Sequence, residues 1–232
     1  MRPKVTSVPP SLTAFALYKR VNRYYRPALA LLIAMYVAGL IGLRVANWQS
    51  YFLLLVPFNL VASAALLLVF HLQWNRAFWA FVSITLLGGY WVEVLGVHTG
   101  LIFGQYAYGR TLGTQGWGVP FVIGLNWLVL VYCTGIITAR LKGAWWIRAA
   151  AGALLMVVLD WLIEPIAVQL DFWSWHGGQI PLQNYLAWFV IAWVFLGVFH
   201  RLNFPKENRL ASVVYLAQLS FFSLHHLLNE WQ

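Results

Sequence analysis

The sequence predicts an all-α fold: a polytopic membrane helical bundle of about seven transmembrane helices, with its amino terminus in the cytoplasm. Hydrophobic residues make up 62% of the 232-residue chain, and charged residues only 9%. Apolar runs approach the ~20 residues that cross a ~30 Å hydrocarbon layer, and they lack the alternation typical of membrane strands. The predicted spans are residues 27–43, 51–72, 78–97, 120–138, 148–170, 184–200 and 209–229.

The positions of the basic residues predict the orientation. Of fifteen Lys and Arg, thirteen fall in the amino-terminal tail and in the connections on one side of the spans, and only Arg44 and Arg110 fall on the other. The positive-inside rule therefore gives a cytoplasmic amino terminus and an external carboxyl terminus. The net charge of +9 is explained by this topology and by anionic lipid headgroups, so no nucleic-acid partner is expected.

The chain divides into a basic cytoplasmic tail, residues 1–26, and a single transmembrane domain, residues 27–232. Residues 11–26, SLTAFALYKRVNRYYR, combine apolar and basic side chains after Ser11. Two interpretations fit them equally: a helix lying on the membrane surface, or a basic flank before the first span. We find no linker or repeat that would separate further domains, and the single cysteine, Cys133, cannot form an internal disulfide.

Three of the six acids, Glu93, Asp160 and Glu164, fall inside predicted spans. A carboxylate in the membrane is costly and usually faces the bundle interior with a partner or a function. Counting from the start of each span at ~1.5 Å per residue places all three in the outer half of the membrane. We therefore predict that they converge on one site. The alternative is a structural role, with the acids satisfied by interhelical hydrogen bonds or by Arg110, His98 or His176.

Asp160 and Glu164 are four residues apart and share one helix face, followed by Pro165, which lacks an amide donor. Two carboxyls in one cavity do not readily both ionise, so one of them is expected to hold a proton. Such a pair can give a proton to a substrate and accept one from water. The sequence predicts acid–base chemistry at this face.

Two long external connections, residues 98–119 and 171–183, are rich in Gly, aromatic and amide residues, and we expect them to fold back over the acids. Several aromatic residues are close to the acids in sequence. They are Tyr90, Trp91, Trp161, Phe172, Trp173 and Trp175. Aromatic faces can line the path of an apolar polyene and stabilise a carbocation.

Other chemistries lack their motifs. The last span contains no lysine for a retinal Schiff base, and the six histidines do not have the spacing of a di-iron site. Paired aspartate-rich motifs for magnesium diphosphate and a nucleotide-binding loop are also missing. We therefore predict no metal and no cofactor.

The ordered motifs resemble those of a known family. They are Glu93-x-x-Gly96 with Thr99-Gly100, Phe103-Gly-Gln-Tyr106-Ala-Tyr108, Gly113, Val119-Pro120, Trp127, Asp160-x-x-x-Glu164-Pro165, Trp173-x-Trp175, Pro181, Asn184 and Trp188. This pattern, over residues 90–190, resembles the membrane carotenoid-biosynthesis proteins that include carotenoid 1,2-hydratases of the CruF type. Glu164 stands where an Asp can occur in the family pattern.

The resemblance implies a cofactor-independent hydratase in a bacterial or archaeal cytoplasmic membrane. Its substrates would be water and an acyclic carotenoid end of the gamma-carotene, lycopene or bisanhydrobacterioruberin type. It adds Tyr106, Tyr108, Trp127 and Asn184 to the substrate-binding residues, with Glu93, Asp160 and Glu164 catalytic. The acid would protonate C2, and water would capture the tertiary cation at C1.

Two alternatives remain open at this stage. A carotenoid cyclase would share the protonation but capture the cation with a double bond. A proton-coupled transporter or a carotenoid-binding protein would carry out no reaction, although the sequence shows no inverted repeat. The sequence also leaves open whether the chain forms a homo-oligomer or associates with other carotenoid enzymes.

Overall fold

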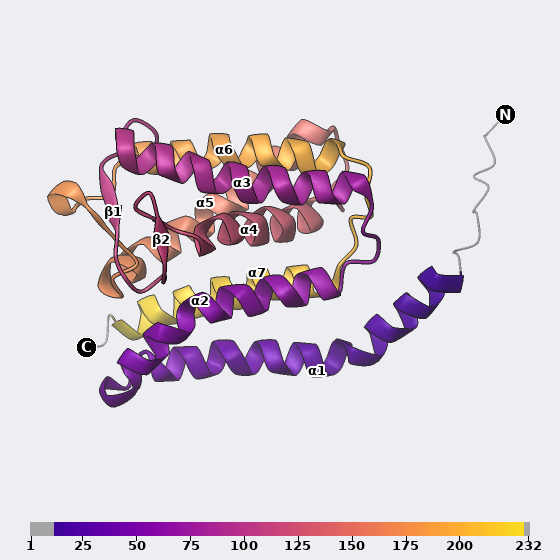
Figure 1. Ribbon diagram of the computed structural model, residues 1–232, viewed down its shortest axis with the longest axis horizontal. Coiled ribbons are helices and arrows are strands. Elements are labelled where there is room, and N and C mark those ends of the chain that lie inside the picture. Colours follow the sequence, from indigo (N-terminus) through magenta and orange to yellow (C-terminus); the bar gives the residue numbers. More distant parts are fainter. Residues whose placement is uncertain (1–11, 230–232) are drawn as a thin grey trace.

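The computed structural model describes residues 12–229, with side chains over residues 23–228, and shows an antiparallel helical bundle capped at one end by short strands (Figure 1). The helices are α1 (Leu12–Gly42), α2 (Ala46–Val69), α3 (Arg76–Thr99), α4 (Val122–Thr138), α5 (Trp145–Gln169), α6 (Leu182–Arg201) and α7 (Arg209–Asn229), with a 3-10 turn, η1 (His176–Gly178). The strands are β1 (Tyr106–Tyr108), β2 (Gln115–Gly116), β3 (Val119–Pro120) and β4 (Trp173–Trp175). The predicted all-α bundle of seven helices is confirmed.

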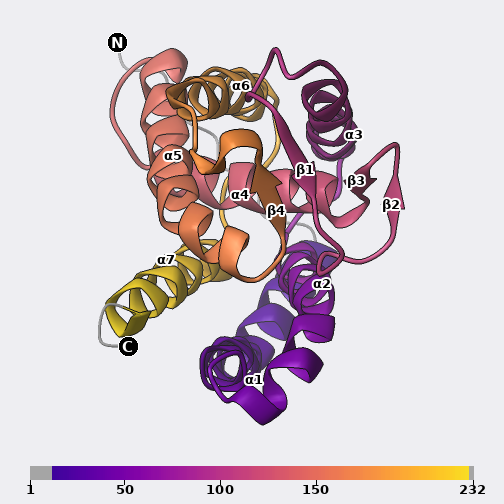
Figure 2. The same cartoon turned by 90° about the vertical axis from the view of Figure 1, so that its left-hand side faces the viewer.

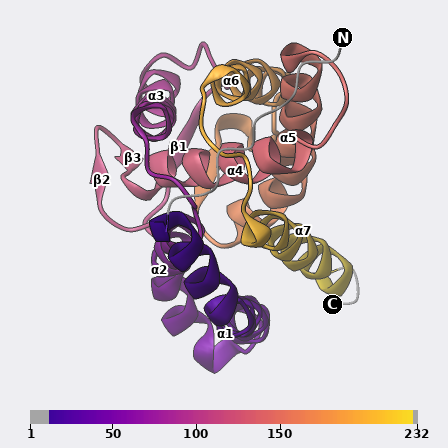
Figure 3. The ribbon, with the colours of Figure 1, turned by 90° about the vertical axis from the view of Figure 1, so that its right-hand side faces the viewer.

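Six of these helices are long and apolar enough to cross a membrane, and α4, with 17 residues, is the shorter one. The core of the bundle is α4, which packs against α2, α3, α5, α6 and α7. Figures 2 and 3, viewed from the two ends, show α4 surrounded by these helices. A helix enclosed by protein has little contact with lipid, so α4 is apolar all round and can be shorter than its neighbours.

The predicted boundary between tail and membrane domain falls inside α1. This helix runs without a break from Leu12 through Pro27 to Gly42, although it bends in Figure 1. Proline is tolerated within membrane helices because neighbouring groups compensate for the lost hydrogen bond. Residues 1–11, including the predicted cap Ser11, lie outside the described residues.

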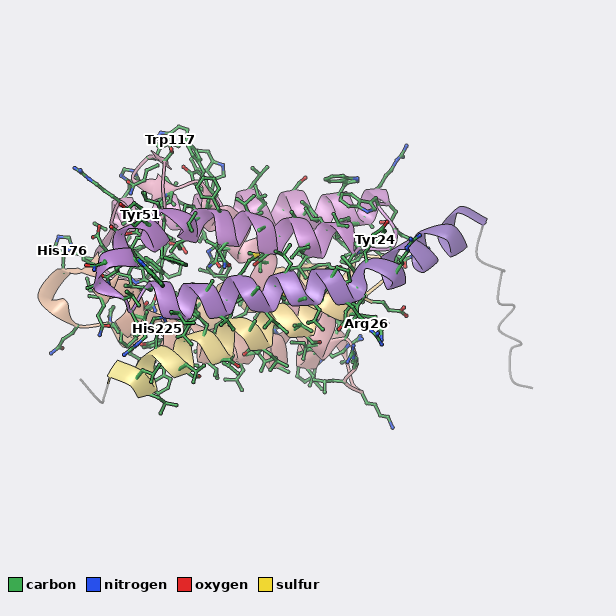
Figure 4. The ribbon with its side chains drawn as sticks, turned by 90° about the horizontal axis from the view of Figure 1, so that it is seen from below. Tyr24, Arg26, Tyr51, Trp117, His176 and His225 are labelled. Atoms are coloured by element: carbon green, nitrogen blue, oxygen red, sulfur yellow. The ribbon has the colours of Figure 1, made fainter. Side chains whose placement is uncertain are left out.

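The helix ends alternate as the predicted topology requires. The amino-terminal end of α1 and the α2–α3, α4–α5 and α6–α7 connections lie at one end of the bundle (Figure 1). The α1–α2 turn and both long loops lie at the other end. In Figure 4, Tyr24 and Arg26 lie at the first end, and Tyr51, Trp117 and His176 at the second. We call these the inner and outer ends, after the predicted cytoplasmic and external sides.

The two long outer loops contain strands that the sequence analysis did not predict. β1, in the first loop, pairs antiparallel with β4, in the second, with Tyr106 opposite Trp175 and Tyr108 opposite Trp173. The backbone N–H groups of Gly109 and His176 extend this ribbon at its two ends, donating to Phe172 O and Gln105 O. The loops therefore fold back over the bundle end as one paired unit.

A second hairpin joins β2 to β3 through Trp117 and Gly118. Both turn residues have positive φ, 50° and 75°, as two-residue hairpin turns of the primed type require. The Tyr90 hydroxyl donates to Gly116 O at 2.7 Å and fixes this hairpin to α3.

Candidate active site

The three predicted acids lie on two helices that flank α4, and all are buried. Glu93 is near the outer end of α3, while Asp160 and Glu164 are in the outer half of α5. Their exposed fractions are 4%, 1% and 1%. Because α3 and α5 both run toward the outer end, the three carboxyls lie near one level, and residues of the paired loops bond to two of them.

Asp160 and Glu164 share a helix face, as predicted from their spacing. The Asn184 side-chain amide, in the first turn of α6, donates to Asp160 Oδ2 at 2.9 Å and to Glu164 Oε1 at 3.2 Å. Asn184 is itself buried, with 2% exposure. One amide group therefore holds both carboxyls of α5 at a common point.

Glu93 accepts three hydrogen bonds from aromatic side chains. Tyr106 and Tyr108 donate their hydroxyls to Glu93 Oε2 at 2.5 and 2.8 Å, and Trp127 Nε1 donates to Oε1 at 2.9 Å. Burying a carboxyl group requires such donors, because its bonds to water are lost. Both carboxyl oxygens of Glu93 therefore accept hydrogen bonds.

The β1–β4 ribbon supplies four of the donors because strand side chains alternate between two faces. Tyr106 and Tyr108 point to the same face of β1, and Trp173 and Trp175 to the same face of β4. Trp173 Nε1 and Trp175 Nε1 both donate to Glu164 Oε2, at 3.0 and 2.8 Å. Strand β1 thus contacts Glu93 and strand β4 contacts Glu164, so the ribbon joins the acids of two helices.

Tyr106 lies between the two glutamates. Its ring contacts that of Trp175, with centroids 5.2 Å apart. Burial, and after it the negative charge of Glu93, raises the pKa of Tyr106, and Glu164 adds to the rise. Tyr106 outside the membrane spans therefore remains a neutral O–H donor to Glu93.

The three carboxyls differ in how many donors they accept. Glu93 accepts three hydrogen bonds and Glu164 accepts three, whereas the only bond found for the Asp160 carboxyl among the described residues comes from Asn184. Donors to a carboxyl favour its charged form. The charged form of Asp160 is therefore stabilised by fewer hydrogen bonds than the charged form of Glu93 or Glu164.

Three predicted substrate-binding residues do not contact the carboxyls. Trp91 is 47% exposed and packs on Trp117, and Trp161 is 61% exposed and stacks on His226. Tyr90 is buried but donates to the β2–β3 hairpin. Successive helix residues are rotated by about 100°, so Trp161, next to Asp160, and Trp91, two residues before Glu93, point away from the acids. Tyr90, three residues before Glu93, lies on the same side of α3 but directs its hydroxyl to the hairpin.

The basic residues that the structural alternative paired with the acids do not bond to the three carboxyls. His98, Arg110 and His176 are exposed, and the named partners of the three carboxyls are uncharged Tyr, Trp and Asn side chains. In Figure 4, His176 lies at the tip of a loop beyond the helix ends. Within the described residues, no group of three His, Cys, Asp or Glu side chains could hold a metal ion.

Two features of the site were not predicted. The Trp188 ring stacks on Trp127 with centroids 4.4 Å apart, behind the indole that donates to Glu93. Gly89, one turn before Glu93, leaves room for Trp127, because a Cβ at Gly89 would lie only 2.5 Å from the Trp127 Cβ. The only signal in the sequence was the occurrence of Trp188 in the family pattern.

Comparison with known proteins supports the family resemblance. Residues 49–231 match the model of a family described as carotenoid biosynthesis protein. The chain is 31% identical over 128 residues to a bisanhydrobacterioruberin hydratase from Haloarcula japonica, a match that covers 52% of this chain and 43% of that relative. The match thus spans less than half the length of the relative. No solved structure matches the chain.

The family match covers most of the chain. It includes Glu93, Asp160 and Glu164 with the side chains that donate to them, which we call the carboxyl cluster. Together with six helices that are able to cross a membrane, it identifies an integral membrane protein. The chain belongs to the carotenoid biosynthesis protein family.

Proposed function

We propose that this protein is a carotenoid hydratase that adds water across the terminal C1=C2 bond of an acyclic carotenoid end. The observation that carries the proposal is the set of three buried carboxyls joined by Asn184 and the β1–β4 ribbon. The similarity to a bisanhydrobacterioruberin hydratase agrees with this reaction, and the substrate is expected to be of that type. The cytoplasmic membrane of a bacterium or archaeon is the expected location.

Asp160 is the proposed proton donor. It shares Asn184 with Glu164, and two carboxyls at one amide group do not readily both carry a charge. Glu164 is held as the anion by Trp173 and Trp175, whereas Asp160 accepts, among the described side chains, only from Asn184. The proton is therefore expected to reside on Asp160.

The reaction then has two steps. The electron pair of the C1=C2 bond takes the Asp160 proton to form a C2–H bond, which leaves a tertiary cation at C1. A water oxygen bonds to C1 and passes one proton to a carboxylate, for which Glu164 is the candidate. Transfer of that proton from Glu164 to Asp160 restores both groups, so the net change is the addition of one water. The anion of Glu93 and the indole faces stabilise the cation in a low dielectric.

Isotope labelling in cells or membranes that contain an acyclic carotenoid tests the reaction. In deuterated water the product should gain one non-exchangeable deuterium at C2, and in water labelled with heavy oxygen its hydroxyl should carry the label. A cyclase would incorporate the deuterium but no oxygen, and a transporter or binding protein would incorporate neither. Mass spectrometry of the extracted pigments distinguishes these results.

A matched pair of variants tests the assignment of the acid. Asp160→Asn should lower the rate by about 10²–10⁴, the usual contribution of a general acid. Glu207→Gln, at an exposed acid in the α6–α7 connection, should keep wild-type activity. Full activity of Asp160→Asn would refute Asp160 as the proton donor.

A further inference from the structure

A large apolar cavity lies next to the carboxyl cluster, between helices α1, α2 and α7 on one side and helices α4 and α5 on the other. Its volume is about 490 Å³, within the range of pockets that bind drug-sized ligands. One wall comes from α1, α2 and α7, including Tyr36, Gly39 and Phe221, and the inner wall includes Asn126 of α4 and Ile163 of α5. Of the predicted site residues, Trp173 alone is among those that line this cavity.

Trp173 belongs to both the cavity and the carboxyl cluster. Its side chain lines the cavity, and its indole N–H donates to Glu164 Oε2 at 3.0 Å. Ile163, the residue before Glu164 on α5, lines the same space. The cavity and the acids are therefore separated by a single indole ring at this point.

The cavity opens toward the lipid along α2. Two of its lining residues, Leu55 and Phe58, are 51% and 67% exposed. Apolar residues that are both part of a cavity and exposed on a membrane helix form a rim through which a hydrophobic ligand can enter from the bilayer. In Figure 2, α1 lies outside the ring of helices around α4 and packs against α2 and α7. The three helices α1, α2 and α7 contribute residues to the cavity wall.

We propose that this cavity holds the acyclic end of a polyene, which enters from the bilayer along α2, and that the Trp173 ring turns aside in the reactive complex so that the terminal double bond reaches the carboxyls of α5. The inference rests on the proposed function, and it adds where and how the substrate is held. The cavity has room for one end of a long isoprenoid, so the remainder of the molecule stays in lipid beyond Phe58. The walls are apolar, as an unsubstituted hydrocarbon chain requires.

The two amides of the cavity fit this role. Asn59 accepts a hydrogen bond from Ser63 at 3.5 Å, whereas the Asn126 side chain makes no hydrogen bond to another described residue. An amide facing an apolar cavity can hold a water molecule next to the bound chain. The Asn126 position therefore offers a place for water on the substrate side of Trp173.

Helix α1 gives the cavity a specificity-determining wall outside the family match. The match begins at residue 49, whereas Tyr36 and Gly39 lie before it. We expect changes in this wall to alter which polyene ends are accepted without altering the acids.

A matched pair of substitutions on α2 tests the cavity. Ala62 lines it, whereas Ala65, one turn on, is exposed and does not. In an Asp160→Asn background, which prevents turnover, Ala62→Phe should reduce the acyclic carotenoid retained by the purified protein about tenfold or more. Ala65→Phe should retain as much pigment as its parent. Equal retention by both variants would overturn the proposal.

Photo-crosslinking gives a second readout that does not depend on the fold of a filled-cavity variant. A benzophenone amino acid at Phe58 should crosslink to the polyene, whereas the same group at Leu154 of α5, which is 57% exposed and does not line the cavity, should not. Equal crosslinking at the two positions would also overturn the cavity assignment.

The two proposals fail in different ways. If Ala62→Phe in the otherwise wild-type chain hydrates its substrate at the wild-type rate, the cavity is wrong and the hydratase assignment stands. If pigment binds at Phe58 but the product gains no oxygen from water, the cavity stands and the hydratase assignment is wrong.

Discussion

The two ends of the bundle both bury polar side chains, but of different kinds. At the outer end three carboxyls are buried under aromatic donors. At the inner end lies a network of uncharged groups, His71, Tyr132 and Asn208. His71 Nδ1 bonds the Tyr132 hydroxyl at 2.8 Å and its Nε2 bonds Gln73 O at 2.8 Å, while Asn208 Nδ2 donates to Tyr132 at 3.2 Å.

The difference distinguishes buried polar groups that stabilise the packing of helices from those that can exchange a proton with a substrate. In the inner network each group has partners, and His71 also stacks on Phe78 with centroids 3.6 Å apart. A neutral, satisfied network of this kind fixes how helices pack. At the outer end, by contrast, two acids share one amide, and Asp160 has a single donor in the part of the chain that the structure describes. We therefore expect changes at the outer end to affect activity and changes at the inner end to affect stability.

The largest expected effect is on turnover at the outer end. Glu164→Gln keeps the side-chain shape but removes the carboxylate that is the candidate base, so the rate should fall by about 10²–10⁴. The glutamine oxygen can still accept from Trp173 and Trp175, but its NH2 group then faces the Asn184 amide donor, so the melting temperature should fall modestly. Pigment analysis and thermal unfolding of the same preparation check both statements, and a wild-type rate in the folded variant would contradict the assignment of Glu164 as the base.

The next effect is the pH dependence of stability at the inner end. Burial lowers the pKa of His71 to about 4 from its ordinary 6.5, and its bond to Gln73 only partly opposes this. The unfolded chain then binds the proton first, so the contribution is present above pH 6.5 and is lost as the pH falls toward 4. The loss is about 3 kcal/mol.

Thermal unfolding measured between pH 7 and 4 tests this. His71→Gln should reduce the slope of the unfolding free energy against pH by the equivalent of up to one proton. His98→Gln, at an exposed position, should leave this slope unchanged. An unchanged slope in the His71 variant would contradict the role of His71.

A smaller effect on stability should come from Tyr132→Phe. The change removes a hydroxyl that His71 and Asn208 both contact, leaving two buried groups with fewer partners, and should cost about 1–3 kcal/mol. Turnover in the folded protein should be unchanged. A lower rate at full stability would show that the inner network contributes to the reaction.

The smallest effect on activity and stability is expected from exposed side chains on the outside of α3 and α5. Trp91→Phe and Trp161→Phe alter exposed rings that do not contact the carboxyls, so activity should stay close to wild type and stability within about 0.5 kcal/mol. A strong loss of activity in either variant would support the prediction that these residues bind substrate.

The sequence by itself determined the bundle, the orientation of its helices and the level of the three acids. These features depend on local quantities: apolar length, the position of Lys and Arg, and the i, i+4 spacing of Asp160 and Glu164. The short sequence YAY also alternates as a strand does. Nothing local indicated its partner, because the WSW strand lies more than sixty residues later in the chain.

Only the tertiary structure decided which side chains reach the acids. Pairing of β1 with β4 turns Tyr106, Tyr108, Trp173 and Trp175 toward two different glutamates, whereas Trp91 and Trp161, beside the acids in sequence, face outward. The cavity behind Trp173 likewise depends on α1, whose packing on α2 and α7 no spacing rule gives. The physical reason is that a helix or strand fixes the direction of its own side chains, while the partner they meet depends on contacts between distant segments.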